Sequence, residues 1–278
     1  MFKRLYGAAL RGFLMAFLVA MPALIVPGTS AEASQATVLI AILAAVFTFV
    51  EYSASSPGIV EFRDAAPFNR LRFMALLLTV FVLSMICKGE VDPTPMTEML
   101  TSVGTLVGSS IDVPYSPVRL VILMLPADID QSVVQSVRNA AGIAYVISFT
   151  AMAAFLVLVR VLGWPSRSGS FNVWVNLPLF DPTTGGDVLR RLYRDARINV
   201  VLGFLLPFVI PAVVKLAADV INPISLENPH ILIWTTSAWA FLSASMIMRG
   251  IALYRVAAMI RDQRRRAYAS ADGGLQAV

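Results

Sequence analysis

The chain is poor in charged residues and in the side chains that usually bind metals and cofactors. Only 14% of its 278 residues are charged, whereas soluble domains average roughly 25%. It contains one cysteine, Cys87, and one histidine, His230, which excludes an internal disulfide, a thiolate metal cluster and a bis-histidine haem. The composition also excludes a disordered chain, a nucleic-acid-binding module and an ordinary cytosolic enzyme. We therefore expect no cofactor, no metal and no nucleic-acid partner.

Apolar side chains are abundant instead. They make up 58% of the residues, and the mean hydropathy is +0.75. Because every backbone polar group must be satisfied within the bilayer, this composition predicts an all-α integral membrane protein with about six transmembrane helices and interfacial amphipathic helices. The predicted spans cover about residues 12–27, 36–50, 73–87, 140–164, 198–220 and 231–248. We expect a single membrane domain over residues 1–266 and a disordered cytoplasmic tail over 267–278.

The basic residues are distributed unevenly around these spans. If six spans alternate in direction, 18 of the 22 basic residues fall on one side of the membrane. The positive-inside rule then predicts a multi-pass protein of a bacterial inner membrane with both termini in the cytoplasm. The first apolar run also has features of a cleaved signal peptide, since Lys3, Arg4 and Arg11 precede it and Ala31-Glu32-Ala33 follows it. We favour a retained first helix.

The link between the third and fourth spans contains the signals of a further helix. Thr94-Pro95 is typical of an N-cap followed by a first-turn proline. Apolar residues then recur at helical spacing, namely Met96, Met99, Leu100, Val103, Leu106 and Val107. The pattern predicts an amphipathic helix that lies on the outer membrane surface or across the bundle. Gly104 and Gly108 form a small-xxx-small pair that allows close helix contact, and ordinary loop packing is the alternative explanation.

The link between the fourth and fifth spans carries an unusual apolar segment, Ser170–Phe180. Its aromatic and aliphatic side chains lie outside the bilayer core, where exposure to water costs about 25 cal/mol per Å². The headgroup layer, the protein's own bundle and a partner protein are three possible burial sites. We hypothesise that Phe171, Trp174 and Phe180 dock a membrane-protein partner.

A basic helix follows this segment. Its basic face consists of Arg190, Arg191, Arg194 and Arg197. Such a face predicts contact with anionic lipid, at about 1 kcal/mol for each basic residue, and the same arginines also serve as a topology signal. Trp164, at the end of the fourth span, is expected to anchor that span in the membrane interface.

Residues suited to catalysis are scarce. No ionisable residue falls in the middle third of any predicted span, and intramembrane charge is the usual indication of a functional site in a membrane protein. The chain also lacks a Gly-x-Ser-x-Gly nucleophile elbow and a His-Glu-x-x-His zinc motif. We therefore expect that the protein is not an enzyme and has no catalytic, cofactor-binding or metal-binding residues.

One short stretch carries a family resemblance. Residues 61–70, with the sequence EFRDAAPFNR, together with the span that ends at Cys87, resemble a family of uncharacterised multi-span inner-membrane proteins from alphaproteobacteria. This resemblance supports a bacterial inner membrane. It implies no activity and no catalytic residues.

Three functions from different classes fit the sequence. A non-catalytic scaffold or accessory subunit of a membrane complex is favoured by the scarcity of buried charge and by the apolar cytoplasmic link. A transporter or channel for a small uncharged solute is the alternative, since Pro207, Pro211, Gly203 and Asn199 in one span suggest a broken helix that lines a substrate site. A membrane-embedded enzyme fits least well. The expected partners are membrane lipids and an unidentified membrane protein.

Overall fold

The computed structural model describes residues 2–56, 58–165, 172, 176–181, 185–217 and 226–275. The elements in these ranges are the α-helices α1 (Phe2–Ile25), α2 (Ala31–Ser53), α3 (Phe68–Gly89), α4 (Pro95–Ile111), α5 (Pro117–Leu123), α6 (Gln131–Arg160), α8 (Val188–Ala217) and α9 (Pro229–Leu275). The predicted all-α fold class is confirmed.

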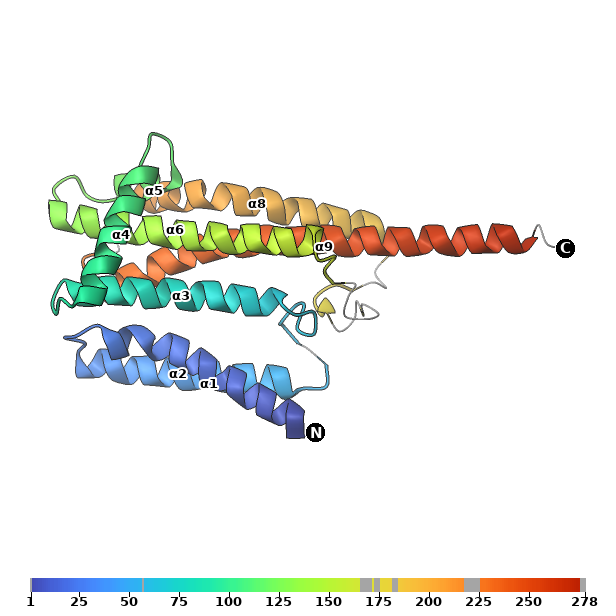
Figure 1. Cartoon of the computed structure of the whole chain (residues 1–278), viewed down its shortest axis with the longest axis horizontal. Helices are drawn as coiled ribbons and strands as arrows, with labels where there is room; N and C mark the ends of the chain where they lie inside the picture. The colour runs from blue at the N-terminus through green and yellow to red at the C-terminus, as the bar shows by residue number, and fades with distance from the viewer. Residues whose placement is uncertain are drawn as a thin grey trace.

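Six of the described helices are long and apolar enough to cross a membrane: α1, α2, α3, α6, α8 and α9. The shortest, α3, has 22 residues, and about 20 residues suffice for a hydrocarbon core of roughly 30 Å. These helices lie along one common direction (Figure 1). Each predicted span overlaps one of them, so the chain has the architecture of a multi-pass membrane protein.

The order of the helices defines two sides of the bundle. We call one side of the bundle the termini side, because both chain ends point that way (Figure 1). It carries residues 2–4, the link 54–67, and residues 161–165 and 185–187. The opposite side, called the far side, carries residues 90–94 and 112–130. Lys88, Arg119, Arg138 and Lys215 belong to helix segments at the far side. The alternation of spans that underlies the predicted charge asymmetry is therefore present in the fold.

The surface of α2 shows why the bundle needs an apolar environment. Ala41 is its one buried residue, and α2 packs mainly against α1. Its exposed large apolar residues are Val38, Leu39, Ile40, Ile42, Leu43, Val46, Phe47, Phe49 and Val50. Such a surface is costly in water and is favourable in lipid.

The helix predicted after Thr94 forms as α4 and crosses α3 and α6 on the far side (Figure 1). Thr94 and Thr97 form a reciprocal capping box at its start. The small-xxx-small pair acts as expected, because a Cβ atom on Gly108 would lie 2.8 Å from the Arg138 carbonyl oxygen and one on Gly142 would lie 2.7 Å from the Gly108 Cα. The small residues therefore set the contact between α4 and α6.

The small residues of α4 face the bundle, and most of its apolar stripe faces outward. Thr97, Gly104 and Gly108 are its buried residues. Four residues of the apolar stripe are exposed, with Met99 at 54% and Leu106 at 68%, whereas Leu100 and Val107 are partly buried against the core. Close approach of two helices needs small side chains, and lipid accepts the larger apolar ones.

The longest helix, α9, continues well past the bundle. Its 47 residues correspond to about 70 Å at 1.5 Å per residue. Ile260 still packs against a core cluster on the termini side, and the side chains of residues 261–269 are exposed. Residues 261–275, called the α9 arm, project away from the other helices (Figure 1). The arm is helical through Leu275, past residue 267, at which composition predicts the start of a disordered tail.

Candidate functional site

The stretch that carries the family resemblance forms the centre of an aromatic cluster on the termini side. Phe62, Phe68, Phe155 and Trp164 are all at most 5% exposed. The Phe62 and Phe68 ring centroids lie 4.7 Å apart, and those of Phe155 and Trp164 lie 5.1 Å apart. Phe62 has a φ of 54°, in the left-handed region that bulky side chains rarely adopt. The cluster thus binds the link 54–67 to α3 and α6.

Trp164 belongs to this cluster and not to the membrane interface. It is 5% exposed, its indole Nε1 donates a hydrogen bond to the Ala65 carbonyl at 3.2 Å, and its own carbonyl accepts one from Arg255 Nε at 3.0 Å. The expectation of an interfacial anchor is therefore corrected. The indole N–H of a tryptophan needs a hydrogen-bond partner when it is buried, and the link supplies one here.

A charged network joins the same link to α9. Glu61 accepts two hydrogen bonds from Arg249, to Oε2 at 2.5 Å and to Oε1 at 2.7 Å. Arg72 Nε donates to Ser245 Oγ, and Arg72 Nη1 donates to Asn69 Oδ1, both at 3.3 Å. Arginine stays protonated at all physiological pH values, so it cannot act as a general base. The network is suited to clamping the link against α9 and not to moving a proton.

Phe180, one of the three residues of the docking hypothesis, lies inside the bundle. It is 9% exposed, and the Arg191 guanidinium lies 4.7 Å from its ring centroid. The nearby Asn176 carbonyl accepts a hydrogen bond from the Phe62 N–H at 2.7 Å. The described end of the apolar segment is therefore packed against the protein itself. Phe171 and Trp174 lie outside the described residues, and partner docking by this segment stays a prediction.

The four arginines of the predicted basic helix lie at the start of α8 and differ in how far they are exposed. Arg190, Arg194 and Arg197 are exposed, so they remain available for anionic lipid, which stays a prediction. Arg191 is half-buried above Phe180. Its role includes the packing of the preceding link as well as charge.

Asp187, directly before α8, connects the helix to the α9 arm. Arg264 Nη1 donates a hydrogen bond to Asp187 Oδ1 at 2.9 Å. This bond lowers the pKa of the Asp187 carboxyl below its ordinary value. This exposed pair joins the base of the arm to the start of α8.

The prolines of α8 do not open a polar site. Pro211 has no N–H to offer the Pro207 carbonyl, and Trp239 Nε1 donates a hydrogen bond to that oxygen at 3.1 Å instead. The neighbouring cavity has a volume of about 50 Å³ and is lined mainly by apolar side chains, among them Val121, Leu125 and Trp239. A lining of this kind offers few hydrogen-bond partners to a polar solute.

A second group of residues was missed by sequence reasoning. Lys3, Arg4 and Arg11 of α1 meet Arg63 of the link around a polar hollow beside the end of α2. The positive-inside rule placed these residues on one side of the membrane. It gave no information about their proximity, because that depends on how the α1–α2 hairpin packs beside the link.

Comparison of the chain with models of protein families, with curated proteins and with solved structures found no match. The resemblance of residues 61–87 to an alphaproteobacterial membrane family stays a prediction. Within the described part of the chain, no three His, Cys, Asp or Glu side chains come together in a way that suits a metal ion. The features described above, namely the aromatic cluster, the Glu61–Arg249 pair and the group of basic residues around the hollow, all lie on the termini side.

Proposed function

We propose that the protein is a non-catalytic multi-pass protein of a bacterial inner membrane that acts as a scaffold or accessory subunit of a membrane complex. The observation that carries this proposal is the α9 arm, which extends about 20 Å beyond the last residue packed on the bundle. A helix needs no such extension to cross a bilayer. A rigid arm that carries Arg261, Arg264 and Arg265 offers a surface for contact with another molecule at the membrane.

Transport of a small uncharged solute is the alternative, and the geometry around α8 favours it less. A transporter site of this type uses unwound backbone with free polar groups. Around Pro211 the helix is continuous, and the freed Pro207 carbonyl accepts a hydrogen bond from Trp239. Asn199, also expected to line such a site, donates its hydrogen bond to the Asp195 carbonyl at 2.8 Å.

The cytoplasmic placement of the termini can be tested by cysteine labelling. Ser56 lies in the link on the termini side, Ser109 lies on the far side, and both are exposed. In a Cys87→Ala background we expect Ser109→Cys to react with an impermeant maleimide in intact spheroplasts and Ser56→Cys to react only after lysis. The reverse labelling pattern would place the termini outside.

The scaffold role predicts a discrete complex that depends on the α9 arm. Full-length protein extracted from its native membranes in mild detergent is expected to migrate as an assembly heavier than the 30.1 kDa chain. A chain that ends at Ile260 lacks the arm but keeps the residues that pack on the bundle. We expect this truncated chain to insert and to lose the assembly, as measured by native gel electrophoresis and mass spectrometry.

A chain that ends at Ala269 is the matched control, because it keeps the exposed basic part of the arm. It should retain the assembly. If the full chain migrates alone in several mild detergents, and reconstituted vesicles take up a solute, the transport alternative replaces the scaffold.

A further inference from the structure

A hollow of about 280 Å³ opens on the termini side between the α1–α2 hairpin and the link that follows α2. Its lining residues are Lys3, Arg4, Gly7, Arg11, Tyr52, Ser55, Arg63 and Asp64. A water molecule occupies roughly 30 Å³ in the liquid, so the hollow has room for a polar group of several heavy atoms. It lies at the ends of two apolar spans, which is the level of lipid headgroups in a bilayer.

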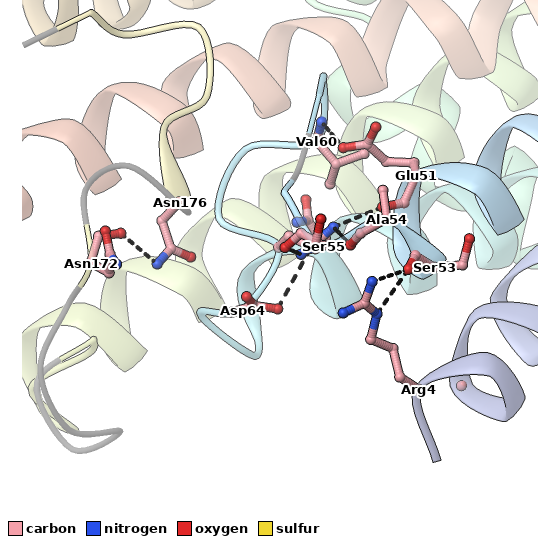
Figure 2. Close-up of polar contacts among 12 residues, drawn as sticks. Arg4, Glu51, Ser53, Ala54, Ser55, Val60, Asp64, Asn172 and Asn176 are labelled. Carbon is pink, nitrogen blue, oxygen red and sulfur yellow. Dashed lines mark hydrogen bonds and ion pairs between the residues drawn. The ribbon is translucent and has the colours of Figure 1, made fainter. Parts of the chain in front are cut away.

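Backbone carbonyls at the end of α2 hold two of the guanidinium groups. Arg4 donates to the Ser53 carbonyl (Figure 2). Arg63 Nη1 donates to the carbonyls of Glu51 at 2.7 Å and Ala54 at 3.2 Å. The last carbonyls of a helix lack intrahelical partners and carry partial negative charge. These contacts fix both groups in place. Arg63 also lies 3.7 Å from Asp64, whereas no ion pair joins Arg4 to an acidic side chain of the described residues.

The remaining two cations, Arg11 and Lys3, have no carboxylate partner among the described residues. Arg11 Nη1 donates to the Gly7 carbonyl at 2.8 Å, and its guanidinium lies 4.7 Å from the Tyr52 ring centroid. Lys3 is exposed, and no ion pair joins it to an acidic side chain of the described residues. Both side chains are therefore free to contact an anion.

The acidic residues nearby do not balance this charge. Asp64 is the one carboxylate in the lining, and it lies 3.7 Å from Arg63 Nε with its side chain 58% exposed. Glu51 is also close and is ionised beside Arg63. Its Oε1 accepts hydrogen bonds from the backbone N–H groups of Gly58 and Ile59 and of Val60 (Figure 2). Four cations thus face two carboxylates, of which Asp64 lines the hollow, so a net positive charge remains.

We propose that this hollow binds a phosphate group, supplied by the headgroup of an anionic phospholipid. Planar guanidinium groups match phosphate oxygens with paired hydrogen bonds, and lysine adds a mobile point charge. The level of the hollow at the ends of α1 and α2 favours a lipid over a soluble phosphate. The proposal does not depend on the scaffold role, because it concerns a lipid contact that any membrane protein can have.

The test counts bound lipids on the purified full-length chain by native mass spectrometry. The protein is titrated with phosphatidylglycerol or with phosphatidylcholine of the same acyl chains, and inorganic phosphate is added as a competitor. Phosphatidylglycerol is expected to bind more tightly. Competition by inorganic phosphate would identify free phosphate as a ligand of the same site, whereas its failure to compete would identify the lipid.

The variant Lys3→Gln/Arg11→Gln removes two cations and spares the two arginines that hold the end of α2. We expect phosphatidylglycerol to bind it about thirtyfold more weakly, from about 1 kcal/mol for each basic residue. The matched control is Arg70→Gln/Arg160→Gln, which removes two exposed cations on the termini side that do not line the hollow and should weaken binding at this site only slightly.

Equal weakening in both double variants would overturn the proposal, because it would show general charge attraction and no built site. Unchanged binding in Lys3→Gln/Arg11→Gln would overturn it as well. Should that variant unfold, Lys3→Gln alone is used, since Lys3 is exposed, and a loss of about fivefold is expected.

Discussion

Replacing Gly203 by alanine is expected to destabilise the bundle by about 1–3 kcal/mol, the usual cost of overpacking. A Cβ atom at this position would lie 2.8 Å from the Ser243 carbonyl oxygen and 2.9 Å from the Ile247 backbone nitrogen of α9. Backbone atoms cannot rotate away as a side chain can, so α8 and α9 must separate. The loss should appear even though alanine favours an isolated helix by about 1 kcal/mol over glycine.

The measurement is thermal unfolding of the purified protein in detergent. For a chain of this size, 1 kcal/mol corresponds to roughly 2–4 °C in Tm. Gly185→Ala is the matched control, because a Cβ atom there meets nothing within 4 Å, and its Tm should stay close to that of the wild type. A Gly203→Ala protein that melts at or above the wild-type temperature would contradict the close contact of α8 and α9.

Removing the carboxylate of Glu61 is expected to destabilise the packing of the link 54–67 against α9. Glu61→Gln leaves Arg249 without its bidentate partner. Breaking a buried pair on one side typically costs about 3–5 kcal/mol, because the remaining charge is left uncompensated. We expect about 3 kcal/mol, the lower end, since the Glu61 side chain is 10% exposed but that of Arg249 is 33% exposed.

A double-mutant cycle separates the ion pair from the loss of the glutamate itself. Glu61→Gln/Arg249→Gln removes both charges and should be more stable than Glu61→Gln alone. Asp64→Asn is the control, because the Asp64 side chain is 58% exposed and lies 3.7 Å from Arg63 Nε. Arg63 keeps its hydrogen bonds to the Glu51 and Ala54 carbonyls without Asp64, so we expect a loss of roughly 0–1 kcal/mol. If Glu61→Gln and Asp64→Asn have equally small effects on Tm, the link is not clamped to α9 by this pair.

The sequence predicted several local features correctly because their causes are local. The apolar runs that became α1, α2, α3, α6, α8 and α9 are long enough to span, and backbone groups in lipid have no alternative to helical hydrogen bonds. The start of α4 followed from Thr94 and Pro95, since a cap needs only residues within the first turn. These predictions required no knowledge of distant contacts.

Other features depended on contacts between distant residues, and sequence patterns misjudged them or missed them. In a membrane protein an apolar stripe does not identify the buried face of a helix, because lipid accepts apolar side chains as readily as the protein interior does. The exposed Met99 and Leu106 on α4 illustrate this. Trp164 resembled an interfacial anchor by its position, yet its indole is buried beside the Ala65 carbonyl.

By itself, then, the sequence determined an all-helical membrane chain with six possible spans and an asymmetric distribution of basic residues. The tertiary structure decided which of those residues meet. Glu61 pairs with Arg249 across 188 positions of the chain, and Arg4 and Arg63 converge on the end of α2. Hydrophobicity sets whether a segment enters the membrane, whereas packing sets its neighbours, because small residues and polar partners select one arrangement among helices that lipid solvates equally well.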